Sequence, residues 1–241
     1  YEIVDCDWSS DVCSSDLARL QYSTMHNNVA AALPRALIFD VDGTLAETEE
    51  LHRRAFNATF AEFGFDWVWD AGLYRDLLKV TGGKERMAHY VERHRPAAPS
   101  DVSDLIPRMH LAKNARYASL VAAGEARLRP GVARLVREAA AAGVRVALAT
   151  TTSRANVEAL LLATFGDAGA RHFPVQVAAE DTRRKKPDPE VYAVALARLE
   201  LSAAECVAFE DSRNGLLAAR AAGIPVVITP SLDRKSTRLN S

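Results

Sequence analysis

Cysteine is scarce in this chain, and long apolar runs are missing from it. Only three of the 241 residues are cysteines, and their spacing fits neither a disulfide framework nor a zinc site, which favours a reducing compartment. No apolar run is long enough to cross a bilayer. The formal net charge of −1 gives no reason to expect nucleic acid or an anionic membrane as a partner. We therefore expect a cytoplasmic protein, and a monomer.

Both ends of the chain lack an apolar face that could be buried. Residues 1–32 are polar and rich in serine and aspartate, and they lack the basic start and apolar centre of a secretory signal. The piece Asp7–Leu17 resembles translated sequencing-adapter DNA, as does the segment 233–241. We therefore leave both ends out of the fold prediction, expect them to be disordered, and expect the native protein to continue past about Asp233.

The rest of the chain is organised around the stretch Ala36–Leu45, in which an apolar run ends in two aspartates one residue apart. The run has apolar residues on both faces, which fits a strand in the middle of a parallel sheet. Asp40 and Asp42 would lie just beyond the carboxyl end of this strand, where ligands bind in such sheets, and on the same side of the chain. Because two such close anions repel each other, we expect a divalent cation beside them, most simply Mg²⁺. Taken alone, the motif is also compatible with an acidic turn.

After this first strand the apolar pattern becomes helical. Apolar residues recur at three- and four-residue steps, and no strand pattern is visible between Thr48 and about Gly124. We therefore predict that residues 48–127 form an all-helical cap domain. It is inserted into a catalytic core made of residues 33–47 and 128–232.

From Pro130 onward, strand and helix patterns alternate. Further strands are predicted at Val144–Ala149, Val175–Ala178, Cys206–Phe209 and Pro225–Ile228, each bounded by turn or capping residues. Strands that alternate with helices pack as a parallel sheet with helices on both faces. The predicted fold class is therefore α/β, a doubly wound parallel sheet with an inserted helical cap.

Polar residues follow four of these strands or lie in the next loops: Asp40 and Asp42, Thr150 and Thr151, Lys186, and Glu210 with Asp211. Because the carboxyl ends of parallel strands meet at one edge of a sheet, all four segments should converge. Each also has a plainer interpretation when taken alone. Thr150 is typical of a helix cap, and Lys186 lies in a charged run typical of a solvated face. Glu210 and Asp211 could simply begin a helix.

In this order, the four segments resemble the four motifs of the haloacid dehalogenase-like superfamily in its phosphotransferase form, over nearly all of residues 33–231. The resemblance implies that Asp40 is a nucleophile that forms an aspartyl-phosphate. It implies that Asp42 is the general acid and base. It also implies a Mg²⁺ site made by Asp40, Asp211 and the backbone carbonyl of Asp42, with Glu210 as a further ligand or a partner of one.

The same resemblance assigns a role to the remaining motif residues. Thr150 and the backbone N–H of Thr151 would hold phosphoryl oxygens at a helix start. Lys186 would neutralise charge on the transferring group and on the nucleophile. The choice of Lys186 over Lys185 rests on the family pattern, in which the lysine stands directly before Pro187.

Residues of the cap would recognise the part of the substrate that does not react. The candidates are Glu47 at the hinge, His52 on the first cap helix, and Gly83, Lys84 and Arg86 in the Gly-rich turn 81–86. A Gly-rich turn that leads into a helix, with two cations beside it, suits a second phosphate. Surface charge is the plainer interpretation of Lys84 and Arg86, and an ordinary core or surface histidine is that of His52.

The amino-acid sequence closely resembles those of the CbbY-type phosphatases in four stretches, residues 40–57, 81–86, 149–153 and 185–187. These enzymes accompany the Calvin cycle and dephosphorylate xylulose-1,5-bisphosphate, which inhibits Rubisco. The resemblance implies a Mg²⁺-dependent phosphatase whose partner is a small sugar phosphate, most specifically that bisphosphate. A bisphosphate also suits the cation pair beside the Gly-rich turn.

Two other functions stay open at this point. A β-phosphoglucomutase-like enzyme has the same cap and motifs but passes the phosphate to a sugar hydroxyl rather than to water, and motif spacing does not separate the two. A non-catalytic phosphosugar-binding module would tolerate loss of the nucleophile, whereas Asp40 and its partners are all present. Dehalogenation and phosphonate cleavage are disfavoured, because those branches lack an acid and base like Asp42.

Overall fold

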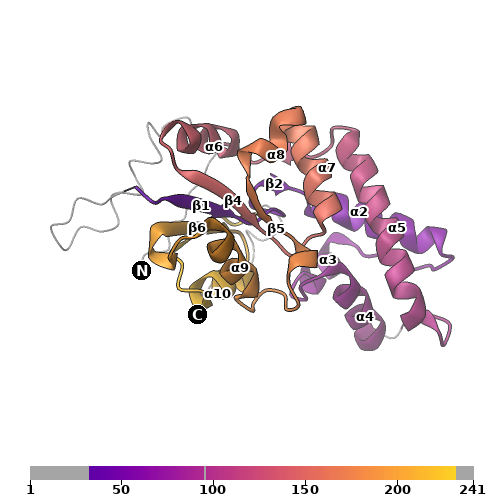
Figure 1. The fold of residues 1–241 in the computed structure, drawn as a ribbon. Helices are drawn as coiled ribbons and strands as arrows, with labels where there is room; N and C mark the ends of the chain where they lie inside the picture. Colours follow the sequence, from indigo (N-terminus) through magenta and orange to yellow (C-terminus); the bar gives the residue numbers. More distant parts are fainter. Residues whose placement is uncertain (1–32, 95, 232–241) are drawn as a thin grey trace.

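The computed structural model describes residues 33–94 and 96–231, and Figure 1 shows a sheet flanked by helices with a group of helices at one end. The expectations about residues 1–32 and 233–241 lie outside the described residues. The core strands are β1 (Ala36–Phe39), β4 (Arg145–Ala149), β5 (Val175–Val177), β6 (Cys206–Glu210) and β7 (Val226–Ile228). The core helices are α6 (Val132–Ala141), α7 (Arg154–Phe165), α8 (Gly169–His172), α9 (Glu190–Leu199) and α10 (Arg213–Ala221), with short 3₁₀ turns at Gly166–Ala168, Ala179–Asp181 and Ala203–Glu205.

The five strands form one sheet in the order β5-β4-β1-β6-β7, and every neighbouring pair is parallel. The predicted doubly wound α/β fold is therefore confirmed. Strand β1 lies in the middle of the sheet, as its two apolar faces predicted. The strand order reverses between β1 and β6, and ligands bind at such a switch point, beyond the carboxyl ends of the strands.

The two faces of the sheet follow from the alternation of side chains along each strand. On β1, Leu37 and Phe39 pack with the residues of α6 and α7. Ala36 and Ile38 point to the other face and pack with α9 and α10. Figure 1 shows these two helix pairs on opposite sides of the sheet. Burial on both faces holds β1, and with it the following loop, in a rigid position.

In the part of the cap that the structure describes there are four helices: α2 (Glu49–Glu62), α3 (Ala71–Leu77), α4 (Gly83–His94) and α5 (Val102–Ala122). Its core is a separate aromatic cluster. The fully buried Trp69 ring lies with its centroid 4.7 Å from that of Phe56 and 4.8 Å from that of Phe60. Among the described residues, no helix combines the length and apolar character that a membrane crossing needs.

The cap is joined to the core by a two-stranded ribbon that the sequence did not predict. Strands β2 (Ala46–Glu47) and β3 (Arg127–Leu128) pair antiparallel, so the two connections between core and cap run side by side. Two-residue strands are too short to carry a visible period. The ribbon therefore brings the two connections between core and cap together at one place.

Two details of the helix starts were predicted wrongly. Helix α7 begins at Arg154 with Ser153 as its N-cap, so Thr150 and Thr151 do not stand at a helix start. Thr151 and Thr152 form a bend before the helix, and the carbonyl of Thr152 accepts a hydrogen bond from Ala179 N (2.9 Å). The predicted Gly-rich turn 81–86 is shorter than expected, because Gly83 is already the first residue of α4.

Candidate active site

Three predicted residues meet at the carboxyl edge of the sheet, around the amine of Lys186. Asp40 follows β1, and its backbone N–H continues the ladder by donating to the Phe209 carbonyl of β6 (3.0 Å). The next residue, Glu210, ends β6. The Nζ atom of Lys186 donates to Asp40 Oδ1 (2.7 Å), Glu210 Oε1 (2.6 Å) and the Ala149 carbonyl (2.8 Å). The lysine thus links three strand ends at the switch point.

The charges in this cluster act on one another through a dry environment. Burial raises the pKa of Asp40 well above its usual range; Lys186 opposes this, while the charges of Glu210 and Asp211 add to it. For Lys186, burial alone would lower the pKa, but the charges of Asp40 and Glu210 raise it above its ordinary value. The lysine is therefore protonated, and the carboxylates need more positive charge than it supplies.

The donor set fits a divalent cation. Asp40, Glu210 and Asp211 each offer a carboxylate oxygen, and these oxygens lie within 4.8 Å of one another. The cluster holds three carboxylates and one lysine, and among the described residues Glu210 Oε2 is buried without a hydrogen-bond partner. Hard oxygen ligands with excess negative charge are what Mg²⁺ prefers. The side chain of Asp42 is not part of this group, so only its backbone carbonyl is left as the ligand that the sequence analysis expected.

Two glycines let the backbone approach the acidic cluster. Gly43 has a φ of +79°, which favours glycine, and a Cβ atom there would clash with the carboxylate of Asp211. Gly215 lies on α10, and a Cβ atom there would clash with the carboxylate of Glu210. Gly215 was not predictable from sequence, because a single glycine in a helix does not indicate what packs against it.

The carboxylate of Asp42 faces the cap rather than the lysine. Its Oδ1 atom accepts a hydrogen bond from Thr48 Oγ1 (2.6 Å) and lies 3.0 Å from His52 Nε2. Burial would raise the pKa of Asp42, but the contact with His52 and the hydrogen bond from Thr48 lower it below its usual range. In this conformation Asp42 is therefore a carboxylate held by the first turn of the cap.

Behind His52 lies a buried lysine that the sequence analysis missed. Lys113 Nζ is 2.7 Å from His52 Nδ1, and it lies over the rings of Phe56 and Tyr117, at 4.8 and 5.4 Å from their centroids. Burial lowers the pKa of Lys113 to about 7. Burial, followed by the charge of Lys113, lowers the pKa of His52. The available signal was the position of Lys113, four residues from buried Tyr117 on one helix face.

The Gly-rich turn lies beside a histidine and a group of lysines. A Cβ atom on Gly83 would come within 2.7 Å of the His110 ring, so glycine leaves room for that imidazole. Lys84 is exposed at the second position of α4. Burial, and then the charges of Lys113, Lys84 and Lys185, lower the pKa of His110 to about 4. Cap and core thus together make a positively charged region.

Arg86 does not point toward this region. Its guanidinium donates to the carbonyls of Leu77 (3.2 Å) and Val80 (3.3 Å) and to the hydroxyl of Tyr74 (3.2 Å). The Tyr74 hydroxyl in turn donates to Glu49 Oε2 (3.1 Å). In this arrangement Arg86 supports the loop before α4 from inside the cap, which differs from the phosphate clamp expected from sequence.

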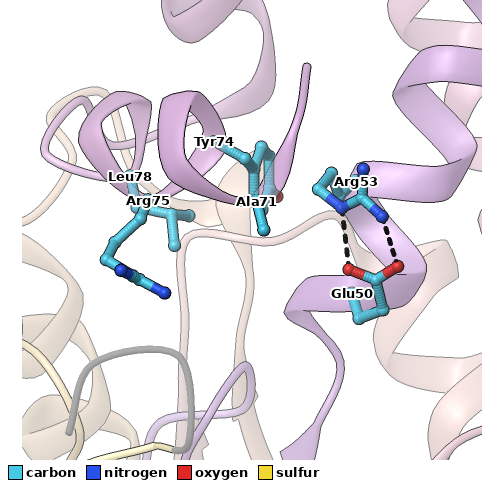
Figure 2. Close-up of a pocket in the computed structure, with 6 residues that line it drawn as sticks. All are labelled: Glu50, Arg53, Ala71, Tyr74, Arg75 and Leu78. Atoms are coloured by element: carbon cyan, nitrogen blue, oxygen red, sulfur yellow. Dashed lines mark hydrogen bonds and ion pairs between the residues drawn. The ribbon is translucent and has the colours of Figure 1, made fainter. Parts of the chain in front are cut away.

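Figure 2 shows a small pocket that Tyr74 helps to line. It lies between α2 and α3, beside the ion pair of Glu50 and Arg53 (2.6 Å). Its volume is about 10 Å³, which is room for about one water molecule. A pocket of this size cannot hold a sugar phosphate, so it is not a candidate substrate site.

A larger cavity of about 450 Å³ opens between cap and core. Residues 79–81 and Glu85 line it from the cap, and 185–187 and Asn214 line it from the core. Lys185 pairs with Glu85 across the gap (2.7 Å), and Asn214 donates to Thr81 Oγ1 (2.9 Å). Lys186 forms part of its wall, and the amine of the same lysine lies in the acidic cluster.

Residues 34–223 match the haloacid dehalogenase-like hydrolases. This range contains the acidic cluster at the strand ends. The chain belongs to this family. It is 55% identical over 197 residues to the protein CbbY of Rhodobacter capsulatus, covering 82% of this chain and 86% of that protein. It is 54% identical over 199 residues to the plasmid protein CbbY of Cupriavidus necator, covering 82% of this chain and 78% of that protein.

Among solved structures, a mutant of CbbY from Rhodobacter sphaeroides in complex with xylulose-1,5-bisphosphate superposes with a TM-score of 0.80. The two share 48% identity, and the match covers 87% of this chain and 90% of that one. The family resemblance that the motifs predicted is therefore confirmed.

Three further predicted residues of this haloacid dehalogenase-like hydrolase lie after β4 and at the ribbon between cap and core. Thr150 is buried directly after β4, and its hydroxyl accepts a hydrogen bond from the backbone N–H of Thr152 (3.2 Å). Thr151 is half-buried beside it. Glu47 pairs with Arg129 (3.2 Å) at the ribbon between cap and core. Arg129 was not a candidate in the sequence analysis.

Proposed function

We propose that this chain is a Mg²⁺-dependent phosphatase that removes a phosphate from a sugar bisphosphate, most specifically xylulose-1,5-bisphosphate. The observation that carries the proposal is the position of Lys186, which contacts Asp40 and Glu210 at once in a buried cluster next to Asp211. The likeness to CbbY proteins, one of them solved with that bisphosphate, supports the choice of substrate.

In the first half-reaction, a carboxylate oxygen of Asp40 attacks phosphorus, and the bond from phosphorus to the sugar oxygen breaks. The protonated form of Asp42 gives its proton to that leaving oxygen. Lys186 offsets the charge that gathers on Asp40 and on the phosphoryl oxygens. The products of this step are the free sugar hydroxyl and an aspartyl-phosphate.

In the second half-reaction, water attacks the phosphorus of the aspartyl-phosphate, and the bond from phosphorus to Asp40 breaks. Asp42 takes the proton of that water, which returns it to the protonated form. The carboxylate held by Thr48 and His52 in this structure is the form that accepts a proton. For the first half-reaction, Asp42 must carry a proton and turn away from those two residues.

The proposed metal ligands are Asp40, Asp211 and the backbone carbonyl of Asp42, with Glu210 joining them or supporting them. When bound, Mg²⁺ supplies positive charge that holds Asp40 ionised and stabilises the transferring phosphoryl group. Thr150 and Thr151, at the end of β4, are proposed to bind the phosphoryl oxygens from the other side.

The non-reacting phosphate is proposed to bind in the positively charged region between cap and core. Lys84, His110 and Lys113 of the cap and Lys185 of the core lie in or next to that region. Gly83 is proposed to contribute by leaving space there. His52 and Glu47 remain proposed substrate residues, with His52 also holding Asp42.

A phosphate-release screen over sugar mono- and bisphosphates, with and without Mg²⁺, tests the proposal. The wild-type chain should release phosphate fastest from xylulose-1,5-bisphosphate and only with Mg²⁺. Asp40→Asn should lower turnover at least ~10³-fold with an unchanged melting temperature. Substantial residual turnover would remove Asp40 as the nucleophile. Isomerised sugar phosphate in place of free phosphate would favour the mutase alternative.

A cytoplasmic location, action as a monomer and a role beside the Calvin cycle complete the proposal. The scarcity of cysteine and the free, buried thiol of Cys206 support a reducing compartment.

A further inference from the structure

We propose that Arg129 is a positioning residue that holds the turn after Asp42 in place and so aligns the general acid. This inference rests on the proposed phosphatase function. Arg129 directly follows β3, the strand by which the chain returns from the cap to the core. Its side chain is buried, with 8% of the residue exposed, and nothing in the proposed chemistry uses it.

The guanidinium joins two segments that lie far apart in the sequence. The Nη1 atom donates to the carbonyl of Gly43 (2.6 Å) and to the carbonyl of Thr229 (2.5 Å), and Nη2 donates to the carbonyl of Pro230 (2.9 Å). Gly43 is the residue after Asp42, whereas Thr229 and Pro230 follow β7. One side chain therefore ties the catalytic turn to the end of the sheet.

Two further contacts hold the same turn. The backbone N–H of Arg129 donates to the Leu45 carbonyl (3.0 Å), and Nε lies 3.2 Å from Glu47 Oε1. Backbone and side chain of Arg129 together thus hold residues 43, 45 and 47. These residues are the first connection between core and cap.

The far end of this link reaches the acidic cluster. The backbone N–H of Thr229 donates to the carbonyl of Glu210 (2.7 Å). Arg129 therefore sets the position of the turn relative to the strand that carries Glu210 and Asp211. A displacement of Gly43 would move Asp42 directly, and proton transfer depends steeply on the position of the donor.

Only an arginine supplies this set of bonds. Its planar fork presents five N–H donors on three nitrogens, which here reach acceptors on two separate segments, residues 43–47 and 229–230. The amine of a lysine is a single point and cannot span them. Arg129→Lys keeps the positive charge and much of the side-chain volume. It therefore tests the hydrogen bonds of the guanidinium rather than the charge.

The experiment compares two substrates that differ in their need for an acid. A sugar alkoxide is a poor leaving group and requires the proton of Asp42, whereas 4-nitrophenolate leaves without one. We expect Arg129→Lys to lower kcat/KM about 10-fold or more for the sugar bisphosphate but less than about 3-fold for 4-nitrophenyl phosphate. Arg145→Lys is the matched control, since Arg145 also donates to a carbonyl, that of Leu199 (2.7 Å), and should leave both values near wild type.

Equal losses on the two substrates would overturn the proposal, because a purely structural role lowers both. Should Arg129→Lys not fold, Thr229→Val removes the hydroxyl that also accepts from Nη1 (3.2 Å) while keeping the shape. It should shift the ratio of the two kcat/KM values about 2-fold in the same direction, and an unchanged ratio counts against the proposal. A wild-type chain inactive on both substrates would instead refute the phosphatase function.

Discussion

Lys113 Nζ lies 2.7 Å from His52 Nδ1, and His52 Nε2 lies 3.0 Å from the carboxylate of Asp42. A buried lysine of the cap is thus connected to the general acid of the core through one imidazole. The His52 ring stacks on Tyr117 with the ring centroids 4.0 Å apart, so its position is fixed. Lys113 and the carboxylate of Asp42 therefore act on each other through His52. The arrangement leads to the first prediction.

We expect Lys113→Met to be more stable than the wild type at pH 6, with a melting temperature higher by about 5 °C. Burial lowers the pKa of Lys113 from 10.5 to about 7. Between these pH values the unfolded chain holds a proton that the folded chain does not, so wild-type stability rises with pH across this window. The gap between variant and wild type should therefore shrink from pH 6 to pH 10, as measured by calorimetry.

The same variant should bind the sugar bisphosphate about 10-fold more weakly, since it lacks a cation beside the proposed second phosphate. Arg116→Met is the matched control, because Arg116 lies on the same helix as Lys113 and pairs with Glu62 at the surface (2.7 Å). A pH-independent stability gap would show that Lys113 keeps its charge throughout.

The second prediction concerns the metal. Glu210→Gln keeps the shape of a fully buried side chain but removes one negative charge from the cluster. We expect the Mg²⁺ concentration for half-maximal turnover to rise about 10-fold or more, and a chelator to abolish wild-type activity. Tyr192→Phe is the control, because it deletes the hydroxyl that donates to Glu210 Oε1 (2.6 Å) and leaves the charge. A Mg²⁺ requirement that Glu210→Gln leaves unaltered would exclude Glu210 from the metal site.

The third prediction separates two neighbouring cations of the Gly-rich turn. Lys84→Ala should raise KM for the bisphosphate about 10-fold with little effect on a small monophosphate and no change in melting temperature. Arg86→Ala should lower the melting temperature, because three acceptors inside the cap lose their donor. It should also slow both substrates alike. If Arg86→Ala raised KM for the bisphosphate alone, Arg86 would bind the second phosphate, as expected from sequence.

The parallel sheet and its active edge were predictable from local patterns. The apolar run before Asp40 has residues for both faces of a sheet, and the run before Glu210 behaves likewise. These features belong to contiguous residues, so a period and a turn suffice to find them. The ribbon of β2 and β3 escaped prediction, since pairing between residues 46–47 and 127–128 has no local signal.

The sequence by itself determined the fold class, the inserted helical cap and the residue types that arrive at the strand ends. Only the tertiary structure decided where the long cationic side chains go: Lys186 inward and Lys185 to Glu85, Arg86 into the cap, Arg129 to the carbonyl of Thr229. The physical reason is that a flexible charged side chain takes its direction from acceptors on distant segments. Arg129 and Thr229 are 100 residues apart, and no local pattern records that they meet.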